Sequence, residues 1–131
     1  MEPPTVRKRL LLVDDDPAFR NSLQEYLERH GHAVETAKNG REALTKLEQA
    51  GYDVVLTDYN MPEVNGLGVL QHVQQYHPFL PVVMMTGERS SNVAVESFVA
   101  LGAQACLFKP FELQQLEEIL KITFAAPLPS L

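Results

Sequence analysis

The sequence predicts an α/β protein with one doubly wound domain, in which a parallel sheet is covered by helices on both faces. Three observations support this fold class. The chain has 131 residues, a length that suits a single domain. Five short apolar runs recur along it, and a helical pattern of apolar residues follows each run. Such alternation of strand and helix implies parallel strands joined by right-handed crossovers.

The five apolar runs are the predicted strands. Four of them are almost continuously apolar, as is typical of strands that are buried on both faces. These four cover residues 10–13, 54–57, 82–85 and 105–108. The remaining run, at residues 33–37, alternates between apolar and polar residues and contains a charged one, which predicts a strand at an edge of the sheet.

The first two helices are predicted from their end residues. One helix begins after Asp16, an N-cap acid that is followed by proline, and it ends at Gly31. The next begins after Asn39, with Glu42 three residues further on, and ends at Gly51. The residues that we expect to face the sheet are Phe19, Leu23, Tyr26, Leu27, Ala43, Leu44 and Leu47.

The last three helices follow the same logic. The third spans about residues 66–76 and stops before a His-Pro pair. The fourth begins at the cap cluster of residues 90–92 and ends at Gly102, and the fifth spans residues 111 to about 124. The apolar residues expected to point inward from these helices are Leu67, Leu70, Val73, Val95, Phe98, Leu101, Leu113, Leu116, Ile119 and Leu120.

The composition excludes several classes of protein. With 17 acidic residues against 11 lysines and arginines, the net charge of −6 argues against a nucleic-acid or anionic-membrane surface on this domain. No run approaches the roughly 20 apolar residues of a membrane span, and the first residues lack the apolar core of a signal peptide, so we expect a cytoplasmic location.

The single cysteine, Cys106, excludes an internal disulfide. The four histidines lack metal-ligand spacing and are predicted to lie on the surface.

Chemically useful side chains follow four of the five predicted strands. They are Asp14, Asp15 and Asp16 after the first strand, Asp58 and then Asn60 after the third, Thr86 and Glu88 after the fourth, and Lys109 after the fifth. Because ligands of open α/β sheets bind beyond the carboxyl ends of the strands, these residues should meet at one edge. Two carboxylates 4 Å apart repel by about 4 kcal/mol at an effective dielectric constant of 20, so we expect a hard divalent cation such as Mg²⁺ among them.

Acids, a cation, a lysine and a hydroxyl are the groups that stabilise a phosphoryl group. A carboxylate can itself be the nucleophile and form an aspartyl phosphate. Asp58 is the best candidate for this role, because it stands alone at the end of a central strand. Asp16 is interpreted as a helix cap.

Four motifs occur in order along the chain. They are Leu-Leu-Val-Asp-Asp-Asp at residues 11–16, Asp58-x-x-Met61-Pro62-x-x-Asn65-Gly66, Thr86-Gly87 and Lys109-Pro110-Phe111. Together they resemble the receiver domains of bacterial response regulators, a chemotaxis-regulator-like family of two-component signalling, over about residues 8–124. The resemblance implies a sheet of order 2-1-3-4-5. We expect an N-terminal extension at residues 1–8, a receiver domain at residues 9–124 and a tail or linker at residues 125–131.

The resemblance also implies a function. Asp58 would accept a phosphoryl group from the phosphohistidine of a sensor histidine kinase or a histidine phosphotransfer protein. The hydroxyl of Thr86 and the ammonium of Lys109 would contact that group, and the Lys109–Pro110 peptide bond would be cis. The implied ligands of Mg²⁺ are Asp14, Asp15, Asp58 and, through its backbone carbonyl, Asn60.

By the same resemblance, phosphorylation would switch the loop after the fourth strand and the surface of the fourth helix, fifth strand and fifth helix. That surface would control a partner, a second receiver or a fused output domain, for example one that regulates transcription. The protein would not be an enzyme, although it would assist its own phosphorylation and dephosphorylation. The family usually has an aromatic residue three positions before the lysine, and here that position is Cys106.

Two alternatives remain at this stage. One is a pseudo-receiver that serves as an interaction module without phosphorylation. The other is a phosphohydrolase with an aspartyl nucleophile after the first strand, in an Asp-x-Asp-x-Thr motif. Ala18 occupies the position where that motif needs Thr or Val, which disfavours the enzyme.

Overall fold

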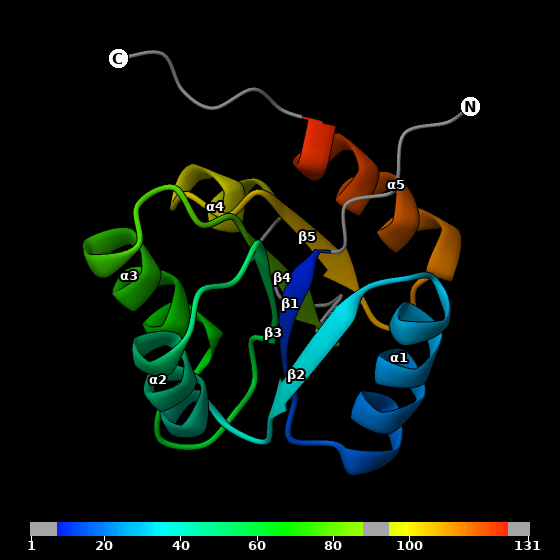
Figure 1. Ribbon diagram of the computed structural model, residues 1–131. Coiled ribbons are helices and arrows are strands. Elements are labelled where there is room, and N and C mark those ends of the chain that lie inside the picture. Colours follow the sequence, from blue (N-terminus) through cyan, green and yellow to red (C-terminus); the bar gives the residue numbers. More distant parts are fainter. Residues whose placement is uncertain (1–7, 88–94, 126–131) are drawn as a thin grey trace.

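The structure is a computed structural model that describes residues 8–87 and 95–125. Strands and helices alternate along this part of the chain, as predicted (Figure 1). The strands are β1 (Arg9–Val13), β2 (Ala33–Ala37), β3 (Val54–Asp58), β4 (Val82–Thr86) and β5 (Ala105–Phe108). The helices are α1 (Pro17–Arg29), α2 (Gly40–Gln49), α3 (Gly66–Tyr76), α4 (Val95–Ala100) and α5 (Leu113–Ala125).

The strands form one parallel sheet in the order β2-β1-β3-β4-β5, which confirms the predicted fold class and strand order. In Figure 1, α1 and α5 lie on one face of the sheet, and α2 and α3 lie on the other. The register places Val13 beside Thr57, Asp58 beside Met85, and Thr86 beside Phe108. The carboxyl ends of the strands therefore meet at one edge.

Two hydrophobic cores hold the helices onto the sheet. Neighbouring strand residues point to opposite faces, so Leu10 and Leu12 belong to one core and Leu11 and Val13 to the other. Leu23 and Leu27 of α1 pack in the first core, together with Leu116 and Leu120 of α5. The second core contains these residues of α2, α3 and α4: Ala43, Leu47, Val69, Leu70, Val73 and Phe98.

Helix ends follow the predicted capping residues. The Asp16 carboxylate accepts hydrogen bonds from the backbone N–H groups of Ala18 and Phe19, at 3.0 and 3.3 Å. The Asn39 side chain accepts from the backbone N–H of Glu42 at 2.8 Å. Gly31 and Gly102 have φ angles of 92° and 109°, the left-handed conformation in which glycine often ends a helix.

Several details differ from the predictions. Leu101 and Leu113 were expected to face inward, but they are 49% and 41% exposed because α4 ends at Ala100 and α5 begins only at Leu113. β5 is the second edge strand, so it is half-buried apart from Leu107 and is not covered on both faces. The predicted cap at residues 90–92, Glu88 and the side chain of Val95 lie outside the described residues.

Membrane-spanning helices were not expected from the sequence. Within residues 8–87 and 95–125, no helix combines the length and the apolar character that a span requires.

Candidate functional site

The carboxyl edge of the sheet brings together the side chains that the sequence placed at strand ends. Asp14 follows β1 and is fully buried, and its backbone N–H donates to Ala37 of β2 at 3.1 Å. Asp58 ends β3 with 6% exposure, and Thr86 ends β4 with 2% exposure. Lys109 follows β5, and its backbone N–H donates to the carbonyl of Thr86 at 2.8 Å. The Lys109–Pro110 bond is cis, as predicted.

Three carboxylates form a compact acid cluster, which we define as Asp14, Asp15 and Asp58. One carboxylate oxygen from each lies within 4.8 Å of the other two. Asp14 and Asp58 are buried, whereas Asp15 is exposed at the mouth of the cluster. The spacing is close enough for a single cation to contact all three residues.

Lys109 is the cation that faces this cluster. Its ammonium nitrogen lies 2.5 Å from Oδ2 of Asp14 and 3.6 Å from Oδ2 of Asp58. The same group lies 4.2 Å from the centre of the Phe19 ring, which in turn packs edge-on against Phe111. One ammonium cannot neutralise three carboxylates, so the cluster keeps a negative charge.

The burial and the neighbouring charges change the pKa of Asp58. Burial raises the pKa of its carboxyl from 3.8 to about 6. Lys109 opposes this rise in pKa, whereas Asp14 and Asp15 add to it, and a hydrogen bond from the backbone of Asn60 lowers it again. The metal-free carboxylate is therefore easy to protonate, and a bound cation would favour its charged form.

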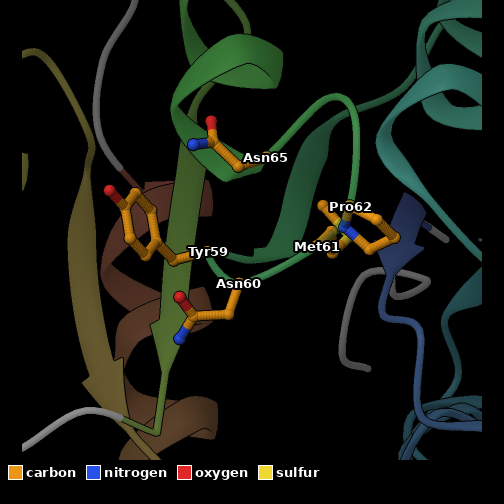
Figure 2. Close-up of a pocket in the computed structure, with 5 residues that line it drawn as sticks. All are labelled: Tyr59, Asn60, Met61, Pro62 and Asn65. Atoms are coloured by element: carbon orange, nitrogen blue, oxygen red, sulfur yellow. The ribbon is translucent and has the colours of Figure 1, made fainter.

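The donor set fits Mg²⁺. It consists of carboxylate oxygens that carry excess negative charge, and small hard cations prefer oxygen ligands. The predicted fourth ligand, the backbone carbonyl of Asn60, belongs to the loop that follows Asp58. That loop borders a hollow of about 380 Å³, and Figure 2 shows Tyr59, Asn60 and Asn65 on one side of it, with Met61 and Pro62 on the other. Mg²⁺ usually keeps several waters, and the exposed Asp15 leaves the mouth of the acid cluster open to them.

The loop between β3 and α3 is held close to the sheet. The backbone N–H of Tyr59 donates to Met85 at 2.7 Å, and that of Gly66 donates to Tyr59 at 2.9 Å. A Cβ atom at Gly66 would lie 2.6 Å from the carbonyl oxygen of Asp58 and 2.6 Å from the sulfur of Met84. Only glycine allows this approach, so the Gly66 of the sequence motif fixes the path of the chain beside Asp58.

One contact of the site was missed by the sequence reasoning. The guanidinium of Arg20, on α1, donates to the backbone carbonyl of Asp14 at 2.7 Å. A signal was present in the sequence, because Arg20 lies one turn into a predicted helix, where the helix dipole disfavours a cation.

Comparison with known proteins assigns the family. A family model described as the response regulator receiver domain matches residues 10–121. The chain belongs to the response regulator receiver domain family. Receiver domains of this family are parts of two-component signalling systems, and the family binds Mg²⁺ at an acidic pocket.

Relatives of this receiver domain include full-length response regulators. It is 37% identical over 113 residues to the response regulator protein PilR of Pseudomonas aeruginosa, covering 86% of this chain and 25% of PilR. It is 42% identical over 108 residues to the transcriptional regulatory protein CpxR homologue of Haemophilus influenzae, covering 82% of this chain and 46% of that protein. The chain thus spans between a quarter and a half of the length of these relatives.

Solved structures of response regulators have the same fold as this chain. The chemotaxis response regulator CheY4 of Vibrio cholerae superposes on this receiver domain with a TM-score of 0.81 and 34% identity, covering 90% of this chain and 99% of CheY4. The response regulator TrrA of Thermotoga maritima, in complex with Mg²⁺ and BeF, gives a TM-score of 0.78 and 32% identity, covering 88% of this chain and 98% of TrrA.

Proposed function

We propose that this receiver domain accepts a phosphoryl group on Asp58 from the phosphohistidine of a sensor histidine kinase or a histidine phosphotransfer protein. The observation that carries the proposal is the position of Asp58. It lies at the end of the central strand β3, in a cluster with Asp14 and Asp15 and 3.6 Å from the ammonium of Lys109. A nucleophile, a cation site and a fixed positive charge therefore converge on one point.

The reaction follows from this geometry. A carboxylate oxygen of Asp58 attacks the phosphorus, the P–N bond breaks, and its electron pair returns to the donor imidazole. Lys109 stabilises the charge that develops on the phosphoryl oxygens, and the hydroxyl of Thr86 donates to one of them. Bound Mg²⁺ supplies positive charge to the acid cluster and the phosphoryl oxygens. Water attack on the same phosphorus later breaks its bond to the Asp58 oxygen, which releases inorganic phosphate and restores the carboxylate. The domain thus assists both steps.

We infer that the output reaches α4 through aromatic packing. Tyr59, next to Asp58, lies with its ring 5.0 Å from the ring of Phe98 in α4. Cys106, where the family usually has an aromatic residue, is half-buried in β5 beside the same core. A phosphoryl group adds roughly −1.5 to −2 charges, which draws Thr86 towards Asp58 and shifts the Tyr59–Phe98 contact.

The controlled surface is then α4, β5 and α5, which we propose regulates a partner, a second receiver domain or a fused output domain. The names and lengths of the relatives support an output in transcription regulation. In this account residues 9–124 form the receiver unit.

The test is site mapping of the phosphoryl group. Incubation of the protein with Mg²⁺ and a small acyl phosphate should produce one phosphorylated peptide, which contains Asp58. Asp58→Asn should abolish the product. The matched control is Asp53→Asn, at the opposite end of the same strand, where an exposed carboxylate accepts from the backbone N–H of Arg9 at 2.7 Å. That variant should react like the wild type.

Other outcomes would contradict the proposal. Label on Asp14, or turnover of many phosphomonoesters, would favour a phosphohydrolase. Unchanged phosphate uptake and partner binding in Asp58→Asn would favour a pseudo-receiver. NMR shift changes on phosphorylation that stay in the Asp58 loop, with none at Thr86 or α4, would refute the proposed output path.

A further inference from the structure

The helix dipole of α1 disfavours a cation at the position of Arg20. This residue lies in the fourth position of the helix, near the positive end of the helix dipole, and the first turn contains no acidic residue. Its side chain is half-buried, and among the described residues no carboxylate lies within ion-pair distance of it. A cation held in such a place needs another partner.

That partner is the turn that carries the acid cluster. The guanidinium of Arg20 donates to the carbonyl of Asp14 at 2.7 Å, and its backbone N–H donates to the carbonyl of Asp16 at 2.9 Å. A hydrogen bond from a charged donor is about twice as strong as a neutral one. The second bond is the ordinary helical one that any residue at this position would make. The contribution of the side chain itself is the bond to the peptide that precedes Asp15.

Asp15 is the member of the cluster that needs this support. Asp14 is buried, with one carboxylate oxygen bound to Lys109 and the other accepting from the backbone N–H of Asp16 at 2.9 Å. Asp58 is buried at the end of a central strand. Asp15 is exposed, and its carboxylate has no hydrogen bond within the described part of the chain. Its direction depends on the backbone of the turn.

We infer that Arg20 is a positioning residue for the Mg²⁺ site, which holds the turn so that the Asp15 carboxylate is directed at Asp14 and Asp58. The inference rests on the proposed function, because it concerns the same cation. Mg²⁺ demands nearly ideal octahedral geometry, so a loosened ligand weakens its binding. The sign of the effect separates this role from a purely electrostatic one, since removal of a nearby positive charge alone would make Mg²⁺ bind more tightly.

The experiment is an NMR titration with Mg²⁺ alone, without a phosphoryl donor, followed at the backbone amides of the cluster residues. Arg20→Gln should weaken Mg²⁺ binding roughly tenfold, the low end of what outer-shell substitutions cost. The matched control is Arg29→Gln in the same helix, where an exposed arginine pairs with Glu25 at 2.6 Å. It should bind Mg²⁺ as the wild type does.

Two further readouts separate positioning from a general loss of structure. In the metal-free protein, the carbonyl ¹³C signal of Asp14 should shift in Arg20→Gln and stay in place in Arg29→Gln. In phosphorylation assays with an acyl phosphate, the Mg²⁺ concentration for half-maximal rate should rise by a larger factor than the maximal rate falls. If Arg20→Gln does not fold, Arg20→Lys replaces it, because an ammonium keeps the charge without the planar geometry of the guanidinium. A loss of Mg²⁺ affinity there reports the altered hydrogen bond with the charge retained.

Mg²⁺ binding that is equal or tighter in the Arg20 variants would overturn the inference and leave the proposed function intact. A wild-type protein that shows no Mg²⁺-dependent shifts would instead refute the proposed function, and the role of Arg20 with it.

Discussion

Helix α1 connects two clusters of acidic and basic side chains that differ in burial. At its start lie Asp14, Asp58 and Lys109, whose side chains are 0%, 8% and 20% exposed. At its C-terminal end, the hydroxyl of Tyr26 donates to Glu117 of α5, and His30 lies 3.1 Å from the same carboxylate oxygen. The side chains of His30 and Glu117 are 47% and 42% exposed. We call these the buried and the exposed cluster.

The comparison shows that the same kinds of residue serve different purposes. Water screens the exposed cluster, so its pairs contribute little and need no further ion. The buried cluster has one ammonium for two buried carboxylates and the nearby Asp15, and little water to screen them. Its charges are costly without a second cation, which is a property suited to a binding site and of little use for stability.

The largest effect is expected from Lys109→Ala, which removes the only cation that contacts both buried carboxylates among the described residues. The metal-free protein should lose about 3 kcal/mol of unfolding free energy, as typically follows when one partner of a buried pair is removed. Urea unfolding measures this loss, and Mg²⁺ should restore part of it. The matched control, Lys121→Ala on the surface of α5, should change little. A loss below about 1 kcal/mol for Lys109→Ala would mean that its ion pairs with Asp14 and Asp58 contribute no more than ordinary surface pairs, which would contradict the account.

A gain of stability is expected from Asp58→Asn. The pKa of Asp58 in the folded protein is about 6, above its ordinary value of 3.8, so the folded state holds this proton more tightly than the unfolded state. The charged carboxylate therefore destabilises the metal-free fold above about pH 6, and the cost disappears as the pH falls towards 4.

A shift of about two pKa units corresponds to about 2.7 kcal/mol. After allowance for screening by solvent, Asp58→Asn should stabilise the metal-free protein at pH 7 by about 2 kcal/mol. The wild-type and variant curves of unfolding free energy against pH should converge near about pH 4. The control is Asp53→Asn, just before the same strand, where the substitution removes an exposed carboxylate that accepts from the backbone of Arg9 and should give no gain in stability. Parallel curves for Asp58→Asn and the wild type would contradict the account.

The smallest effect belongs to the exposed cluster. Glu117→Gln removes the carboxylate that pairs with His30 and should lower the unfolding free energy by less than about 1 kcal/mol, with or without Mg²⁺. The hydrogen bond to Glu117 raises the pKa of Tyr26 to about 12, so this substitution should return the pKa towards 10. NMR titration of the tyrosine ring measures it. A Tyr26 pKa that stays at about 12 in the variant would show that Glu117 is not the cause.

Most of the buried cluster could be predicted from the sequence because parallel strands place their carboxyl ends at one edge. The positions of Asp14, Asp58 and Lys109 follow from strand boundaries that short apolar runs define well. The position of Arg20 near the start of a predicted helix indicated that its charge needs a partner. The atom that it contacts, the carbonyl of Asp14, could not be predicted, since it depends on the path of a turn that no residue pattern specifies.

The contacts of the exposed cluster could not be predicted from the sequence for a different reason. Tyr26 was assigned to the apolar face of α1, and His30 to the surface, and both assignments agree with the structure. Their common partner is 87 or more residues away along the chain, and the relative rotation of α1 and α5 decides the contact. The exposure of Leu113 has another cause: this residue is the first of α5, so the helical periodicity that predicted it to face inward does not extend before it.

The central claim is that the buried cluster holds Mg²⁺ around a phosphate-accepting Asp58. Its most direct test is ¹⁹F NMR with beryllium fluoride, a mimic of the phosphoryl group. The wild-type protein should show bound fluoride signals only when Mg²⁺ is present, and Asp58→Asn should show none. Bound signals without Mg²⁺, or equal signals in Asp58→Asn, would contradict the account.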